Sequence, residues 1–139
     1  MMTQMTASDS SPPSTRSRVG LANGVFDCFH PGHRRFLYEA HKLCEYLIVA
    51  VNDDASVRRL KGPGRPIHDV RLRMDHVSAW ADLTIQFDGD VTDLVLCYRP
   101  DIVIRGWDQK TDDAPGTRVV QLPKFGDIST TEILKCGAT

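Results

Sequence analysis

Short apolar runs alternate with segments of helical period along most of this chain. The apolar runs predict five strands, at residues 19–22, 46–51, 83–87, 101–104 and 117–122. Helical spacing predicts helices at 32–44, 54–60, 70–80 and 91–98, with Asp54 as a helix cap and Leu72, Val77 and Trp80 as core residues. Because this alternation is typical of α/β proteins, we expect an open parallel sheet of about five strands with helices on both faces.

The first 17 residues differ from the rest of the chain. They are rich in Ser, Thr, Pro and Met, which predicts a disordered N-terminal tail at 1–17 followed by one folded domain at 18–139. No apolar run approaches the ~18 residues of a membrane span. The four cysteines have no paired spacing, as suits a reducing compartment. We expect a cytoplasmic protein without a membrane partner.

The chain has a net charge of -1, which argues against general electrostatic binding to nucleic acid. Its cations are nevertheless unevenly spread. Residues 58–73 contain only one acid, Asp69, but six cations: Arg58, Arg59, Lys61, Arg65, Arg71 and Arg73. Such a run forms either a solvated face or a local anion-binding surface. Lys61 also begins a Gly- and Pro-rich segment, which is either a surface turn or a constrained loop that aims the lysine at a ligand.

Two histidines follow the first predicted strand, at the point where open parallel sheets usually bind their ligand. His30 and His33 enclose Pro31 and Gly32 at the start of the first helix, whose N–H groups favour anions. The expected ligand is a phosphate group. As alternatives, either histidine could be structural, or the pair could bind zinc with Cys28 as a third ligand. Cys28 is otherwise expected to pack.

Two later segments also carry candidate chemistry. Residues 105–108, Arg-Gly-Trp-Asp, directly follow a predicted strand and should emerge at the same sheet edge. A last short helix is predicted to open at 126–132. Ser129 and Glu132 have the spacing of a capping box there, but hydroxyls at a helix N-terminus also form a phosphate site, and the two roles can coexist.

Three of these segments resemble one family. Residues 24–33, Gly-Val-Phe-Asp-Cys-Phe-His-Pro-Gly-His, resemble the H-x-G-H loop of the cytidylyltransferase-like nucleotidyltransferases. Residues 51–66 with Arg73-Met74 resemble the bacterial heptose 1-phosphate adenylyltransferases, and 128–131, Ile-Ser-Thr-Thr, resemble the terminal motif of the family. The likeness spans about residues 19–135 and implies a Rossmann-like fold. Members of the family join a nucleoside triphosphate to a small phosphorylated alcohol and release pyrophosphate.

The resemblance also implies a role for each matching residue. His30 and His33 would contact the triphosphate and the reacting phosphorus, Lys61 would bind the acceptor phosphate, and Arg73 would lie among the phosphates. The remaining nucleotide-binding residues would be Gly24, Val25, Phe26, Asp27, Gly32, Arg105, Gly106, Trp107, Asp108, Ile128, Ser129, Thr130 and Thr131. The nucleotide would bring Mg²⁺ without a protein ligand. The partners would be small-molecule substrates and, in a homodimer, a second copy.

Two departures from the family pattern bear on the substrate. Heptose enzymes usually show K-G-G-D-Y where this chain has Arg-Gly-Trp-Asp-Gln at 105–109. Residues 126–131 are closer to glycerol-3-phosphate cytidylyltransferases, in which an arginine stands where this chain offers Lys124. We expect nucleotidyl transfer from ATP to a phosphorylated acceptor such as heptose 1-phosphate. The alternatives are a CTP-dependent enzyme acting on glycerol 3-phosphate or a similar polyol phosphate, and an inactive nucleotide-binding module.

Overall fold

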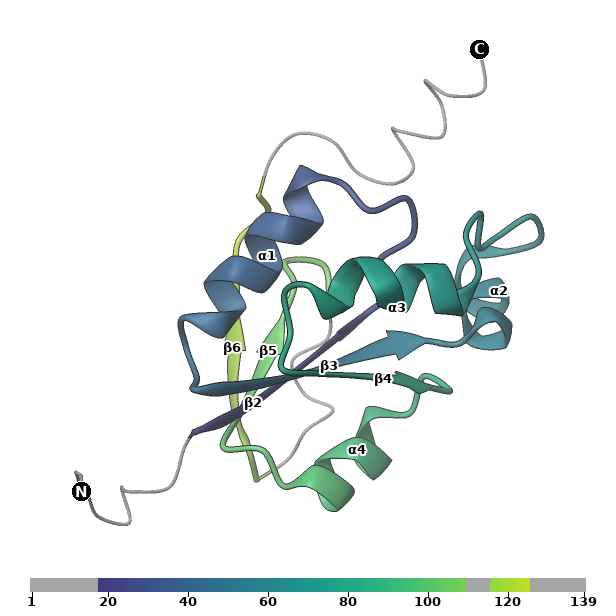
Figure 1. The fold of residues 1–139 in the computed structure, drawn as a ribbon. Coiled ribbons are helices and arrows are strands. Elements are labelled where there is room, and N and C mark those ends of the chain that lie inside the picture. Colours follow the sequence, from purple (N-terminus) through teal and green to yellow (C-terminus); the bar gives the residue numbers. More distant parts are fainter. Residues whose placement is uncertain (1–17, 110–115, 126–139) are drawn as a thin grey trace.

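The computed structural model describes residues 18–109 and 116–125, and Figure 1 shows its elements along the chain. The strands are β2 (Val19–Gly24), β3 (Tyr46–Asn52), β4 (Leu83–Phe87), β5 (Ile102–Arg105) and β6 (Arg118–Gln121). The helices are α1 (Pro31–His41), α2 (Asp54–Lys61), α3 (Val70–Ser78) and α4 (Val91–Tyr98). Every predicted strand and helix within the described residues is therefore present.

The five strands form one parallel sheet in the order β4-β3-β2-β5-β6, which confirms the predicted fold class. The chain builds outward from β2 through β3 to β4, then returns to the other side of β2 to add β5 and β6. The strand order therefore reverses at the neighbouring strands β2 and β5. Such a switch point is where open α/β sheets bind ligands, outside the carboxyl ends of the strands.

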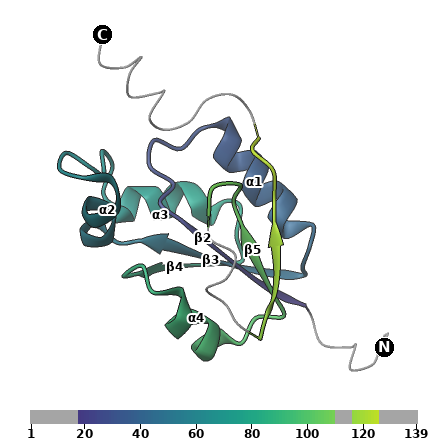
Figure 2. The same ribbon diagram turned by 180° about the vertical axis from the view of Figure 1, so that it is seen from behind.

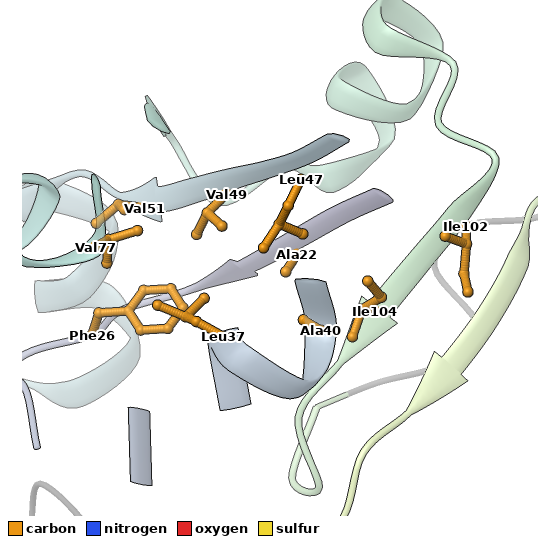
Figure 3. Close-up of a cluster of buried hydrophobic side chains, with 10 residues drawn as sticks. All are labelled: Ala22, Phe26, Leu37, Ala40, Leu47, Val49, Val51, Val77, Ile102 and Ile104. Atoms are coloured by element: carbon orange, nitrogen blue, oxygen red, sulfur yellow. The ribbon is translucent and has the colours of Figure 1, made fainter. Parts of the chain in front are cut away.

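Helices cover both faces of the sheet, as predicted (Figures 1 and 2). Helices α1 and α3 lie on one face, and α4 lies on the other. Alternate residues of β3 separate accordingly, because successive side chains of a strand point to opposite faces. Val49 and Val51 join the core cluster beneath α1 and α3 (Figure 3), whereas Ala50 packs with Phe87 and Val91 on the side of α4.

Two local predictions were wrong. The N-cap of α2 is Asp53, whose carboxylate accepts a hydrogen bond from the Ser56 N–H at 2.8 Å; Asp54 is the first helical residue. In α3, Leu72 is 40% exposed, and the position next to it, Arg73, is fully buried instead. Val77 is buried and Trp80 packs against the core as expected. The helical period thus identified α3 and two of its three predicted core residues correctly.

Several predictions lie outside the described residues. They are the N-terminal tail at 1–17 and the terminal helix with Ile128, Ser129, Thr130 and Thr131. The domain boundary at residue 18 therefore stays a prediction. None of the helices described here combines the length and the apolar character needed to cross a membrane.

Candidate active site

The two histidines of the H-x-G-H loop cap helix α1. His30 is the N-cap residue, and its Nδ1 accepts a hydrogen bond from the Gly32 N–H at 3.0 Å. The Nδ1 of His33 accepts in return from the His30 N–H at 3.3 Å. The pair therefore forms a reciprocal capping box in which imidazole nitrogens act where carboxylate or hydroxyl oxygens usually do.

This capping changes how the loop can bind an anion. The N–H groups of the first turn were expected to serve as donors, but His30 and Gly32 donate to ring nitrogens and His33 donates to the His30 carbonyl at 3.0 Å. Pro31 has no N–H. Because both Nδ1 atoms accept hydrogen bonds, each neutral ring carries its proton on Nε2. The groups of the loop that can donate hydrogen bonds to an anion are therefore the two Nε2–H groups rather than the N–H groups of the helix backbone.

The two imidazoles are also held as neutral rings. They stack with their centroids 3.8 Å apart, and the ring centroids of Phe26 and Phe29 each lie 5.5 Å from that of His33. Burial lowers the pKa of His33 to about 3, with repulsion from His30 and Lys61 acting in the same direction and Asp27 opposing them. Burial and the nearby Arg34 lower the pKa of His30 as well. At neutral pH the site offers two uncharged donors.

Asp27 anchors the segment after α2 to the histidine loop. Its carboxylate accepts hydrogen bonds from the backbone N–H groups of Ile67 at 2.7 Å and His68 at 3.0 Å, and from Arg65 Nε at 3.3 Å. Burial raises its pKa, but these donors outweigh burial, and the net pKa is lowered. Asp27 is 1% exposed and its carboxylate accepts hydrogen bonds from the protein, so its expected role in nucleotide binding stays a prediction.

Arg73 holds the same two segments from the other side. Its guanidinium is fully buried and donates to the Val25 carbonyl at 2.8 Å, the His68 carbonyl at 2.9 Å and Asp54 at 2.7 Å. With no exposed surface, Arg73 lies inside the protein, and its expected place among the phosphates stays a prediction. Asp54 can make this contact because the cap belongs to Asp53. In this structure Arg73 is a positioning residue for Val25 and for the loop at His68.

Lys61 is the last residue of α2 and is exposed. Its charge contributes to the lowered pKa of His33, after burial and His30, so the ammonium acts on the histidine loop. The helix ends next to it at Gly62, whose φ of 94° favours glycine. The end of α2 therefore places a cation close enough to influence His33, and the expected contact of Lys61 with the acceptor phosphate stays a prediction.

The carboxyl end of β5 forms the other half of the switch point. Arg105 is buried and its Nη1 donates to the Asn23 side chain at the end of β2, so it too is a link within the protein. The next residues form a tight turn, closed by a hydrogen bond from the Gln109 N–H to the Gly106 carbonyl at 3.1 Å. Trp107 and Asp108 are exposed on this turn. Lys124 Nζ lies 5.2 Å from the centroid of the Trp107 ring.

Gly32 shows where the chain passes after β6. A Cβ atom at this position would lie 2.8 Å from the Phe125 carbonyl oxygen and equally close to the His30 ring. The Arg35 guanidinium of α1 lies 5.3 Å from the Phe125 ring centroid. Glycine is therefore required at position 32, because the segment that leads to residue 126 packs directly against the histidine loop.

The predicted site residues thus differ in burial. The exposed ones are Lys61, Trp107 and Asp108, and the partly buried ones are Gly24, Val25, Gly32, His33 and Gly106. The buried ones are Phe26, Asp27, His30, Arg73 and Arg105. Sequence reasoning missed Gln109 and Gln121. Gln121 carries no sequence signal, because it comes from β6 and meets the turn only in three dimensions.

One described group has the composition of a metal site. Ligand atoms of Asp27, Cys28 and His68 lie within 4.8 Å of one another. The Asp27 carboxylate already accepts three hydrogen bonds from the 65–68 segment and one from the Cys28 N–H at 3.0 Å. Burial and the charge of Asp27 raise the pKa of the Cys28 thiol, whereas a metal ligand must be a thiolate. These residues fit a hydrogen-bonded anchor better than a metal centre.

Known proteins resemble the chain in both sequence and structure. A 43% identical relative is the bifunctional protein HldE of Pseudomonas syringae, matched over 76% of this chain and 23% of its own length. The HldE protein of Hyphomonas neptunium is 38% identical over 84% of this chain and 26% of its own. The chain thus spans about a quarter of the length of these relatives.

Among solved structures, the lipopolysaccharide core biosynthesis protein of Thermoplasma volcanium superposes with a TM-score of 0.71 at 31% identity, covering 80% of this chain and all of that one. A pantoate-beta-alanine ligase of Francisella tularensis matches at 10% identity with a TM-score of 0.58, covering 89% of this chain and 70% of that one, which shows the fold alone. The Cytidylyltransferase-like family pattern matches residues 21–128, which include the histidine loop, the sheet and the turn at Trp107. With its paired imidazoles at the switch point of a five-stranded parallel sheet, the chain belongs to the cytidylyltransferase-like family.

Proposed function

We propose that this domain transfers an adenylyl group from ATP to a small phosphorylated acceptor, with heptose 1-phosphate as the favoured acceptor, and releases pyrophosphate. The observation that carries the proposal is the pair of neutral, stacked imidazoles at the switch point, with the Lys61 cation close enough to lower the pKa of His33. The relatives named HldE and the lipopolysaccharide core biosynthesis protein support the choice of acceptor. They favour it over a CTP-dependent reaction with glycerol 3-phosphate.

In the proposed reaction, an oxygen of the acceptor phosphate attacks the α-phosphorus of the nucleotide in line with the bond to the β-phosphate. A new phosphorus–oxygen bond forms, the bond to pyrophosphate breaks, and no covalent intermediate with the protein is needed. The acceptor phosphate is already ionised at neutral pH, so no general base is required. The domain has to bring two anions together and neutralise the charge that develops.

Five of the described residues have a part in this proposal. The Nε2–H groups of His30 and His33 donate to the non-bridging oxygens of the triphosphate, and Lys61 binds the acceptor phosphate. Trp107 and Asp108 border the base or the sugar. Mg²⁺ arrives with the nucleotide, where it would neutralise phosphate charge, and it has no assigned protein ligand. Ser129, Thr130 and Thr131 remain proposed phosphate contacts on the strength of the family motif.

Neutral donors suit this chemistry for a physical reason. Low pKa values keep the imidazoles in a single protonation state across the physiological range, so their hydrogen-bond pattern does not change with small shifts in pH. Their Nδ1 atoms are fixed by the helix backbone, which aims the Nε2–H groups before substrate binds. Such preorganised donors stabilise a charged transition state without reorganising during the reaction.

A substrate panel tests the proposal. Pyrophosphate release should be measured with ATP, CTP and GTP, each against heptose 1-phosphate, other sugar 1-phosphates and polyol phosphates. We expect ATP with heptose 1-phosphate to give the highest kcat/KM. A preference for CTP with glycerol 3-phosphate would favour the cytidylyltransferase alternative. Nucleotide binding without pyrophosphate release for any pair would show that the domain is an inactive binding module.

We also propose that the domain forms a homodimer. Leu96 is 68% exposed on α4, beside the edge strand β4, and Tyr98 on the same helix is 36% exposed. Apolar side chains on an outer helix and an unpaired strand edge are surfaces that a second copy can cover. Light scattering should give a mass twice that of the chain, and Leu96→Glu should lower it to the monomer mass. A wild-type monomer would contradict this proposal.

A further inference from the structure

The amide nitrogen of Gln121 gathers three backbone carbonyls of the turn that carries Trp107. Its Nε2 lies 3.1 Å from the Gly106 oxygen, 3.0 Å from the Trp107 oxygen and 3.2 Å from the Gln109 oxygen. One amide nitrogen has two N–H groups, so at least one of them is shared between two carbonyls. Without this donor, three partial negative charges would face one another across the turn.

A second glutamine holds the turn from the opposite side. Gln109 Oε1 accepts from the Gly106 N–H at 2.6 Å, and its Nε2 donates to the Asn23 carbonyl at 2.9 Å. Asn23 belongs to β2 and Gln121 to β6, so the turn after β5 is tied to both neighbouring strands. Its backbone is therefore fixed, although the Trp107 side chain at its tip is 53% exposed.

The exposed indole is itself restrained. Lys124 follows β6 three residues after Gln121, and its ammonium lies over the Trp107 ring in a cation–π contact at 5.2 Å. An exposed aromatic ring on a rigid backbone at the ligand edge of a sheet is a stacking surface for a planar group. In the proposed function, the planar group on this side of the switch point is the nucleobase.

We propose that Gln121 is a positioning residue of the nucleotide site: it presents the Trp107 ring as a preformed stacking surface for the nucleobase. This inference rests on the proposed function, because it takes the planar ligand to be that of a nucleotide. Gln121 acts through the turn and does not itself touch the base. Its removal should therefore weaken nucleotide binding and leave acceptor binding unchanged.

Two substitutions at position 121 test the inference. Gln121→Glu keeps the size of the side chain but sets a carboxylate against three carbonyls, and Gln121→Ala removes the side chain. Gln121 is exposed on an edge strand, so both variants should fold. Gln86→Glu is the matched control, since Gln86 is exposed on the opposite edge strand, β4.

Trp107 supplies a direct readout. The chain has two tryptophans, so in a Trp80→Phe background the fluorescence reports on Trp107 alone. We expect ATP to quench this fluorescence, and Gln121→Glu to raise the ATP concentration needed by about tenfold, the order of one base–aromatic stacking contact. The KM for the acceptor should not change. Trp107→Phe should keep the KM for ATP near the wild-type value, whereas Trp107→Ala should raise it.

Two results would overturn the inference. One is an unchanged Trp107 signal at saturating ATP, and the other is equal ATP affinity in the Gln121→Glu, Gln121→Ala and Gln86→Glu proteins. A Gln121 variant that loses thermal stability but binds ATP as tightly as the wild type would also overturn the inference. The binding titration needs no turnover. If ATP quenches Trp107 in a Gln121-dependent way but no acceptor releases pyrophosphate, the proposed function fails and the role of Gln121 stands.

Discussion

The rings of His30 and His33 stack with their centroids 3.8 Å apart and their planes 24° from parallel. Each ring uses Nδ1 to accept a hydrogen bond from the backbone at the start of α1, which leaves Nε2–H as its donor. A capping arrangement that stabilises the helix thus also aims two donors. In this family member, the structural role of the histidines and their proposed chemical role are performed by different atoms of the same rings.

His33→Ala should lower kcat by about 10²–10³, the usual cost of losing one preorganised donor to developing charge. The ring also caps His30, so circular dichroism and thermal unfolding must show that the variant is folded. His41→Ala is the matched control, because His41 lies in the last turn of the same helix and contacts Asp82 instead of the site. A His33→Ala protein with nearly wild-type kcat would reject the donor role.

Acidification should destabilise the protein between about pH 6.5 and about pH 3 through His33. The pKa of His33 is about 3 when folded, against 6.5 for an ordinary histidine, so the unfolded chain binds a proton in this window that the folded protein does not. The stability due to the neutral ring is therefore complete above pH 6.5 and decreases as the pH falls towards 3. Asp27, whose pKa is lowered from 3.8, stabilises the folded protein above that pH, and this contribution is lost as the pH falls further.

Thermal unfolding measured from about pH 8 to about pH 4.5 checks this sign. The Tm should fall more steeply with decreasing pH in the wild type than in His33→Asn, which has no ring to protonate. Parallel Tm curves for the two proteins would show that His33 is not held neutral by the fold.

Arg73→Lys should destabilise the domain by about 1–3 kcal/mol, the cost of leaving a buried polar group unsatisfied. A lysine cannot reach Val25, His68 and Asp54 together, because it lacks the planar fork of the guanidinium. Urea unfolding measures the loss. Arg71→Lys, two residues earlier and exposed on the same helix, should leave the stability unchanged. A variant at position 73 with wild-type stability would contradict the positioning role.

Lys61→Ala should raise the KM for the acceptor by about tenfold or more, as expected for a lost hydrogen bond to a charged group. The KM for ATP should change less, because the imidazoles hold the nucleotide. Steady-state kinetics with each substrate varied in turn separates the two effects. Lys42→Ala removes an exposed cation at the C-cap of α1, where it contacts Glu39, and should change neither KM. Equal effects of Lys61→Ala on both substrates would remove its assignment to the acceptor.

The order of the elements and the place of the ligand edge followed from the sequence alone. Alternating apolar runs report which segments are buried and with what period, and this information is local. It was enough to predict the strands, their parallel arrangement and the loop at His30 and His33. Where burial depends on a neighbouring element, the pattern misled: Leu72 faces solvent, and Arg73 takes the buried position because Val25, His68 and Asp54 surround it with acceptors.

Only the tertiary structure decided which polar groups remain available to a ligand. The backbone donors at the start of α1 are taken by the two imidazoles, and the Asp27 carboxylate is taken by donors 38 to 41 residues further along the chain. Gln121 lies on another strand, 12 to 15 residues further along the chain than the turn carbonyls to which it donates. A sequence motif specifies which groups a site contains, but hydrogen bonds are exclusive, and the fold determines which of those groups are already satisfied.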